Sequence, residues 1–205
     1  MSRRVVVTGL GVASPFGRAL DAFWDGLVSG RSAAEPFEAE AVGTVPAVVV
    51  DGADDAAARF GARDARRMSR AGRLAALAVA DALEDAGLGD APHGGVGLSL
   101  GCVHGGAEAW FTGHDTLRER GADRVSPLTV PLGLTNSPAA GAARVLGLTG
   151  PSLSVTTACA AATDAIGQAL AAVRAGRADV VVAGGAEAPL SPLVIGGYAA
   201  RGALS

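Results

Sequence analysis

The sequence predicts an α/β fold, with a mixed, mostly parallel sheet covered by helices on both faces. Short apolar runs typical of buried strands alternate with segments of helical periodicity. Strands separated by helices return in the same direction, which gives parallel pairing and helices on each face. The chain has 205 residues, of which 49% are hydrophobic and 18% charged, enough for a substantial core.

The expected elements follow one another along the whole chain. We expect strands at residues 3–8, 45–50, 96–100, 152–155 and 179–183, and helices at 20–28, 66–86, 107–120, 137–146 and 159–175. The longest helix, 66–86, rests on small and apolar residues that recur every three or four positions, with Gly87 at the expected C-cap. After Glu187 the sequence is rich in proline, glycine and serine and predicts no final element.

Composition excludes several classes of function. Every one of the 17 basic residues is arginine, so neither a phosphate-binding Gly-rich loop with lysine nor a Schiff-base lysine is possible. The net charge of −3 argues against nucleic-acid binding. No apolar stretch reaches the length of about 18 residues that spans a membrane, and the start does not read as a signal peptide, so we expect a cytoplasmic protein. Two cysteines and three histidines show no metal-ligand spacing.

The glycine turn after the first expected strand has the wrong spacing for a dinucleotide site. Gly9 and Gly11 are followed by Ser14 where a third glycine is needed, and Asp51 is too far along the chain to bind a ribose. The turn is therefore interpreted as a simple strand ending.

Cys159 is the most informative residue. It follows a short strand and two threonines and opens a helix among small residues, where unpaired backbone N–H groups favour an anion such as a thiolate. The same N–H groups can bind the oxyanion formed when a thioester is attacked. However, Cys159 also shares a helical face with Ile166 and Leu170, so spacing alone leaves open that it is a small buried hydrophobic residue.

At this segment the chain resembles the β-ketoacyl-acyl-carrier-protein synthases, condensing enzymes of fatty-acid and polyketide assembly with the thiolase-like fold. The resemblance rests on Val155-Thr156-Thr157-Ala158-Cys159-Ala160, Ile166-Gly167, Ala178 to Glu187, Val7 to Gly11, Ser126-Pro127 with Val130-Pro131, and Gly196-Gly197-Tyr198 through Ala203-Leu204-Ser205. It covers residues 1–205 and corresponds to the N-terminal half of such an enzyme, with the C-terminal half absent.

The resemblance implies that Cys159 accepts an acyl group from a carrier-protein thioester, with its own N–H as half of the oxyanion hole. A malonyl-carrier protein then loses carbon dioxide, and its carbanion attacks the acyl-enzyme. The histidines and lysine that assist decarboxylation belong to the family's second half. We therefore expect a complementing C-terminal-half chain, a dimer of such pairs, an acyl carrier protein that presents substrates on phosphopantetheine, and no cofactor, metal, nucleic acid or membrane.

Further site residues follow from the resemblance. The residues that line the acyl channel in the family match the following positions of this chain: His104, Leu128, Thr129, Leu193, Ile195 and Tyr198. An apolar residue is usual at the position of His104, so the histidine either hydrogen-bonds a more polar acyl group or merely belongs to a turn; Leu193 and Ile195 can equally be core residues. Carrier-protein docking is expected at Arg63, Arg66, Arg67, Arg124 and Arg201, although a solvated face would look the same.

Two other functions and one trivial explanation stay open. The chain could be a non-catalytic scaffolding subunit that kept its cysteine, or a thioester acyltransferase that works without decarboxylation. A truncated coding sequence would give the same half-length pattern.

Overall fold

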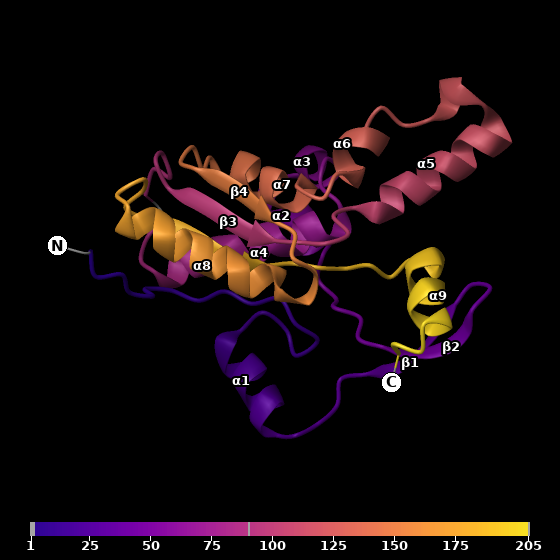
Figure 1. Ribbon diagram of the computed structural model, residues 1–205, viewed down its shortest axis with the longest axis horizontal. Coiled ribbons are helices and arrows are strands. Elements are labelled where there is room, and N and C mark those ends of the chain that lie inside the picture. Colours follow the sequence, from indigo (N-terminus) through magenta and orange to yellow (C-terminus); the bar gives the residue numbers. More distant parts are fainter. Residues whose placement is uncertain (1–2, 90, 205) are drawn as a thin grey trace.

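The structure is a computed structural model that describes residues 3–89 and 91–204. Its core is a parallel sheet (Figure 1). Strand β3 (Gly97–Gly101) is the central strand, and β4 (Ser152–Val155) and β5 (Val181–Gly185) pair with it on either side, both parallel to it. All five residues of β3 are buried, as expected for a strand covered on both faces.

Helices cover both faces of this sheet. Helix α8 (Ala161–Arg174) contacts all three strands, while α4 (Arg70–Asp85) and α7 (Ser137–Leu146) pack against each other and against the sheet (Figure 1). Leu77 of α4 and Leu98 of β3 are among the most deeply buried side chains. The predicted α/β class, with helices on both faces of a parallel sheet, is confirmed.

The other elements lie around this core. They are α1 (Leu20–Val28), the antiparallel hairpin of β1 (Glu35–Ala39) and β2 (Gly43–Ala47), α2 (Asp55–Phe60), α3 (Ala62–Ala65), α5 (Ala107–Arg120), η1 (Ala122–Arg124), α6 (Thr129–Gly133), η2 (Ala158–Ala160) and α9 (Pro192–Ala200). Figure 1 shows α5 and α6 extending away from the sheet, and α1 and α9 lying outside the helical layers. None of the helices in the described ranges combines the length and apolar character that crossing a membrane requires.

Several predicted elements have shifted ends. The predicted helix 66–86 begins only at Arg70, because the Ser69 hydroxyl caps it by accepting a hydrogen bond from the Gly72 N–H at 3.1 Å. The predicted helix 159–175 begins at Ala161 and is preceded by a single 3₁₀ turn that contains Cys159. The predicted strand 45–50 is β2, which ends at Ala47 and pairs in the hairpin, away from the main sheet.

Two expectations were wrong. Residues 3–8 form no strand: they lie beside the sheet without entering its hydrogen-bonded ladder. The segment after Glu187 does contain an element, helix α9, which Ser191 caps by accepting from the Val194 N–H at 3.4 Å and which has Pro192 at its first position.

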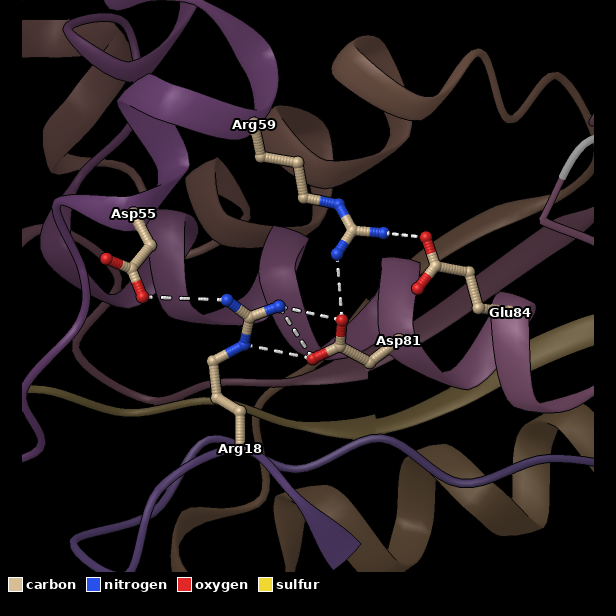
Figure 2. A network of polar contacts seen from close by, with 5 residues as sticks. All are labelled: Arg18, Asp55, Arg59, Asp81 and Glu84. Carbon is tan, nitrogen blue, oxygen red and sulfur yellow. Dashed lines mark hydrogen bonds and ion pairs between the residues drawn. The ribbon is translucent and has the colours of Figure 1, made fainter.

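A network of charged side chains holds the N-terminal part of the chain against α4 (Figure 2). The Arg18 guanidinium donates to Asp81 from Nε at 3.0 Å and from Nη2 at 2.7 Å, and Arg59 of α2 donates to the same carboxylate at 2.9 Å. Arg59 also pairs with Glu84, and Arg18 lies 3.7 Å from Asp55. The hydrogen bond to Asp81 is the main cause of the raised pKa of Arg18. Because the Asp81 side chain is only 19% exposed, this pairing stabilises more than a surface ion pair does.

Candidate active site

The ends of the three parallel strands define the site. Strands β3, β4 and β5 run in the same direction, so the residues that follow them meet at one edge of the sheet. The Cys102 N–H donates to Val155 O at 3.0 Å, and the Thr156 hydroxyl donates to Cys102 O at 2.9 Å. On the other side, the Ala186 N–H donates to Gly101 O at 3.1 Å. Three segments distant in the sequence are thus hydrogen-bonded at this carboxyl edge.

Cys159 lies at this carboxyl edge, in the 3₁₀ turn that leads into α8, and its side chain is exposed. The preceding residue, Ala158, has a φ of +50°, a left-handed conformation that an alanine adopts only at a cost of about 1–2 kcal/mol. No hydrogen bond within the described part of the chain uses the Cys159 backbone N–H. An exposed thiol beside a free N–H, held by a strained turn, is suited to attack a thioester and bind the resulting oxyanion.

Close packing fixes where this turn lies. A Cβ atom on Gly101 would be 2.3 Å from the carbonyl carbon of Ala161, so only glycine lets β3 approach the start of α8 this closely. The Thr157 hydroxyl donates to Asp164 Oδ2 at 2.5 Å and ties the turn to the beginning of the helix. The cysteine is therefore positioned by the sheet on one side and by its own helix on the other.

The second cysteine has a different environment. Cys102 is 3% exposed, and burial, together with the nearby Glu187 carboxylate, raises the pKa of its thiol to about 12. Its sulfur accepts a hydrogen bond from the Gly105 N–H at 3.3 Å and donates to Glu187 at 3.5 Å. Of the two cysteines, Cys159 is therefore the candidate nucleophile.

The structure brings two of the expected channel residues together. His104 lies in the turn after β3, and its Nε2 is 3.3 Å from the hydroxyl oxygen of Tyr198 on α9. Leu193, also on α9, is exposed, whereas Ile195 is buried. Leu128 and Thr129 lie by α6 instead, where they line a cavity of about 640 Å³ that has neither His104 nor Cys159 in its wall.

Only two of the five arginines expected to dock a carrier protein line a common cavity. Arg66 and Arg124 line the same 640 Å³ cavity. Arg63 and Arg67 flank Asp64, whose pKa is lowered mainly by a hydrogen bond from Arg144 and also by these two charges. Arg201 follows α9 and does not line that cavity.

Glu187 is the functional candidate that sequence reasoning missed. Its carboxylate accepts hydrogen bonds from the backbone N–H groups of Val103 at 2.9 Å and His104 at 3.3 Å, and Oε2 lies 3.4 Å from His104 Nδ1. The signals in the sequence were its place two residues after the glycine-rich end of β5 and its inclusion in the Ala178 to Glu187 segment that carries the family resemblance. Within residues 3–89 and 91–204, no three histidine, cysteine or carboxylate side chains are grouped closely enough to hold a metal ion.

Comparisons with known proteins give one consistent result. The family model for the N-terminal domain of β-ketoacyl synthases matches residues 2–205. A 3-oxoacyl-[acyl-carrier-protein] synthase 2 of Vibrio cholerae is 37% identical over 99% of this chain and 50% of its own length.

Solved structures of the same kind superimpose on this chain. The ishigamide ketosynthase/chain length factor has a TM-score of 0.85 and 28% identity, over all of this chain and 52% of its own. A ketosynthase in complex with its type II polyketide synthase acyl-carrier protein has a TM-score of 0.77 at 23% identity, over 95% of this chain and 54% of its own, and this likeness concerns the fold. The chain spans about half the length of the curated relatives that it matches.

Proposed function

Because this chain belongs to the β-ketoacyl synthase family, as the N-terminal domain of its members, we propose that it carries the acyl-accepting nucleophile of a β-ketoacyl-acyl-carrier-protein synthase. The observation that carries this proposal is the exposed Cys159 at the carboxyl edge of the sheet, with its N–H free for an oxyanion. The buried thiol of Cys102 is unsuited to the role.

The proposed reaction begins with acyl transfer. The Cys159 thiolate attacks the carbonyl carbon of an acyl-carrier-protein thioester, and the Cys159 N–H donates to the oxyanion that forms. The carbon–sulfur bond to the carrier then breaks, the carrier's phosphopantetheine thiol leaves with a proton, and the acyl group stays on Cys159. A malonyl-carrier protein subsequently loses carbon dioxide, and its carbanion attacks this acyl group to give a β-ketoacyl product and the free cysteine.

Decarboxylation needs hydrogen-bond donors for the developing enolate, and the histidines of this chain have other roles. Both ring nitrogens of His93 are close to backbone carbonyls, at 2.8 Å from Leu146 O and 3.0 Å from Leu88 O. His104 is held beside Glu187 and Tyr198, and His114 is an exposed residue of α5. We therefore propose that a complementing chain, equivalent to the other half of the relatives, supplies these donors.

An apolar groove supports this second chain. A cavity of about 530 Å³ is lined by residues 5–11, by β5 and by residues of α4 and α8. Within the described residues, β5 pairs only with β3, so its other edge presents free N–H and C=O groups to the groove. Val7 is 81% exposed beside it. An unpaired strand edge facing an apolar cavity fits an added strand of another polypeptide.

The proposal is tested by intact mass spectrometry of the complex with the complementing chain, after incubation with octanoyl-acyl carrier protein. We expect one octanoyl adduct on this chain, its loss in Cys159→Ala and its persistence in the control Cys102→Ala. An adduct of the same size in Cys159→Ala would refute the assignment. A non-catalytic scaffolding subunit would give no adduct in the wild type or in either variant.

A thioester acyltransferase without decarboxylation is the second candidate, because Cys159 and its N–H suffice for acyl transfer alone. Release of carbon dioxide from malonyl-acyl carrier protein by the acylated complex distinguishes the two. A condensing enzyme releases it together with a β-ketoacyl product, and a simple acyltransferase does not.

We further propose that the arginines around α3 dock the acidic acyl carrier protein. Arg66 faces the cavity that Arg124 also lines, and Arg67 lies directly beside it in the chain. Charge reversal in Arg66→Glu and Arg67→Glu should slow acyl transfer from the carrier protein at low salt, with the difference narrowing as salt screens the charges. Loading from a short pantetheine thioester is the control and should not change. Equal slowing with both donors would contradict docking.

A further inference from the structure

The turn that carries His104 is held rigidly at the carboxyl edge of the sheet. On one side, the Glu187 carboxylate accepts hydrogen bonds from the N–H groups of Val103 and His104. On the other, the chain passes close under the segment before α7: Gly105 has a φ of +60°, and a Cβ there would be 2.4 Å from Leu134 O. The backbone position of His104 is therefore fixed from both sides.

Three polar side chains from different segments lie in a row at this turn: Glu187, His104 and Tyr198. Oε2 of Glu187 lies 3.4 Å from Nδ1 of His104, and Nε2 of His104 lies 3.3 Å from the hydroxyl of Tyr198. The imidazole and phenol rings meet edge to face, with centroids 6.1 Å apart and an interplanar angle of 73°. His104 Nδ1 is buried and makes no hydrogen bond within the described residues, so the carboxylate acts on it by charge alone. That charge favours the tautomer with the proton on Nδ1, in which Nε2 accepts from the Tyr198 hydroxyl.

Helix α9 presents Tyr198 to this histidine. Ser191 caps the helix and Ile195 is buried, so the residue one turn later has a defined place. The Tyr198 side chain stays partly accessible, at 41%. Its oxygen therefore keeps a lone pair for a further hydrogen bond, on the same carboxyl edge that carries Cys159.

We propose that Glu187, His104 and Tyr198 form a polar relay, with the charge of Glu187 beside His104 and a hydrogen bond between His104 and Tyr198, that selects acyl groups with a carbonyl or hydroxyl oxygen over saturated ones. The inference rests on the proposed function of Cys159. A saturated chain laid against the relay would strip water from the phenol oxygen and the imidazole and return no hydrogen bond. An oxygen on the chain would replace that water: a hydroxyl donates to the phenol oxygen, and a ketone accepts from the phenol hydroxyl when that hydroxyl turns from Nε2 of His104 towards the chain.

In this relay Tyr198 and His104 face the acyl group, whereas Glu187 is a positioning residue that acts through His104. A purely structural alternative exists, in which the His104–Tyr198 contact only holds α9 in place. The two roles differ in what they affect, because a structural contact changes stability without changing the choice between acyl groups.

The test is a competition for Cys159 in the complex with the complementing chain. Octanoyl-pantetheine is mixed in equal amounts with 3-oxooctanoyl- or 5-oxooctanoyl-pantetheine, and intact mass spectrometry gives the ratio of the two adducts. We expect the wild-type complex to prefer at least one oxo chain. Tyr198→Phe should reduce that preference about tenfold, equivalent to about 1.4 kcal/mol.

Two further variants separate positioning from packing. Glu187→Gln keeps an oxygen that accepts from the backbone N–H groups but loses the charge beside His104, so we expect a smaller reduction of the preference. His114→Leu, on the exposed surface of α5, is the matched control and should keep the wild-type ratio. If Tyr198→Phe does not fold, His104→Gln takes its place with the same expected loss of preference.

The outcomes separate this inference from the proposed function. If none of the thioesters leaves an adduct on the wild-type complex, the proposed role of Cys159 is wrong and the relay falls with it. Adducts in a ratio that Tyr198→Phe leaves unchanged overturn the relay alone, and a lowered melting temperature with that unchanged ratio assigns the contact to structure.

Discussion

Iodoacetamide treatment at pH 8 should alkylate Cys159 and leave Cys102 unmodified. The magnitude follows from the raised pKa of Cys102, which is about 12 against an ordinary value of 9.0. At pH 8 roughly 1 in 10⁴ of the Cys102 side chains is a thiolate, against roughly 1 in 10 for an ordinary thiol, a deficit of about a thousandfold in the reactive form. Because Cys102 is also 3% exposed, the reagent reaches even this fraction poorly.

The assay is peptide mapping by mass spectrometry after timed alkylation of the native protein, with the urea-unfolded protein as the control in which both cysteines react. Comparable alkylation of Cys102 and Cys159 in the native protein would refute the assignment of Cys102 to the protected interior.

The same raised pKa makes stability depend on pH in a defined direction. The folded state keeps the Cys102 thiol protonated above pH 9, where the unfolded chain ionises it. Its contribution is therefore complete below pH 9 and is lost as the pH rises towards 12. Between pH 8 and pH 10 the free energy of unfolding should fall by about 1 kcal/mol more in the wild type than in Cys102→Ala. A parallel pH dependence of the two proteins would contradict this.

Two substitutions test the charge network on α4 and the packing of β3 against the beginning of α8. Asp81→Asn removes the ionic acceptor of two arginines and should lower the free energy of unfolding in urea by about 2 kcal/mol, whereas Asp25→Asn, on the exposed surface of α1, should change it by less than about 0.5 kcal/mol. Gly101→Ala drives a methyl group into the Ala161 backbone and should cost about 3 kcal/mol and slow acyl loading. Gly167→Ala on α8, where a Cβ meets nothing within 4 Å, is the control. If a variant and its control lower the free energy of unfolding equally, the interpretation that the pair tests, charge pairing or close packing, is wrong.

Elements with local signals could be predicted from the sequence. Helix α7 agrees with its predicted range residue for residue, because Pro138 lies in its first turn and Gly147 ends it with a φ of +65°. Strand β4 also agrees, since its few residues are bounded by proline and by the threonines. Such signals depend only on neighbours in the chain.

Elements that depend on distant partners could not be predicted. Residues 3–8 have three consecutive valines, yet a strand needs a ladder partner, and this segment lines the groove together with β5 without pairing with it. Helix α9 was missed for the opposite reason. It contains two glycines and an apolar sequence without helical periodicity, and it is defined by its cap at Ser191 and by burial of Ile195.

The same distinction applies to the site. Cys159 could be proposed as the candidate nucleophile because its strand, turn and helix are contiguous in the sequence. The contacts of Glu187 with His104 could not, because 83 positions separate the two residues and only the pairing of β3 with β5 brings their strand ends together. Tyr198 is farther still, 94 positions from His104, and reaches it through the placement of α9.

Under the proposed function, a second polypeptide explains both the unpaired edge of β5 and the missing partners of Cys159. Within the described residues, one edge of β5 lacks a strand partner, and none of the hydrogen bonds or ion pairs of the three histidines is with Cys159. A small ligand in the groove could cover apolar surface, but it would neither continue the backbone ladder nor bring hydrogen-bond donors to the carboxyl edge. A polypeptide equivalent to the other half of the relatives can do both. It follows that a strand-breaking proline introduced in that polypeptide, in the segment that pairs with β5, should weaken assembly and condensation together.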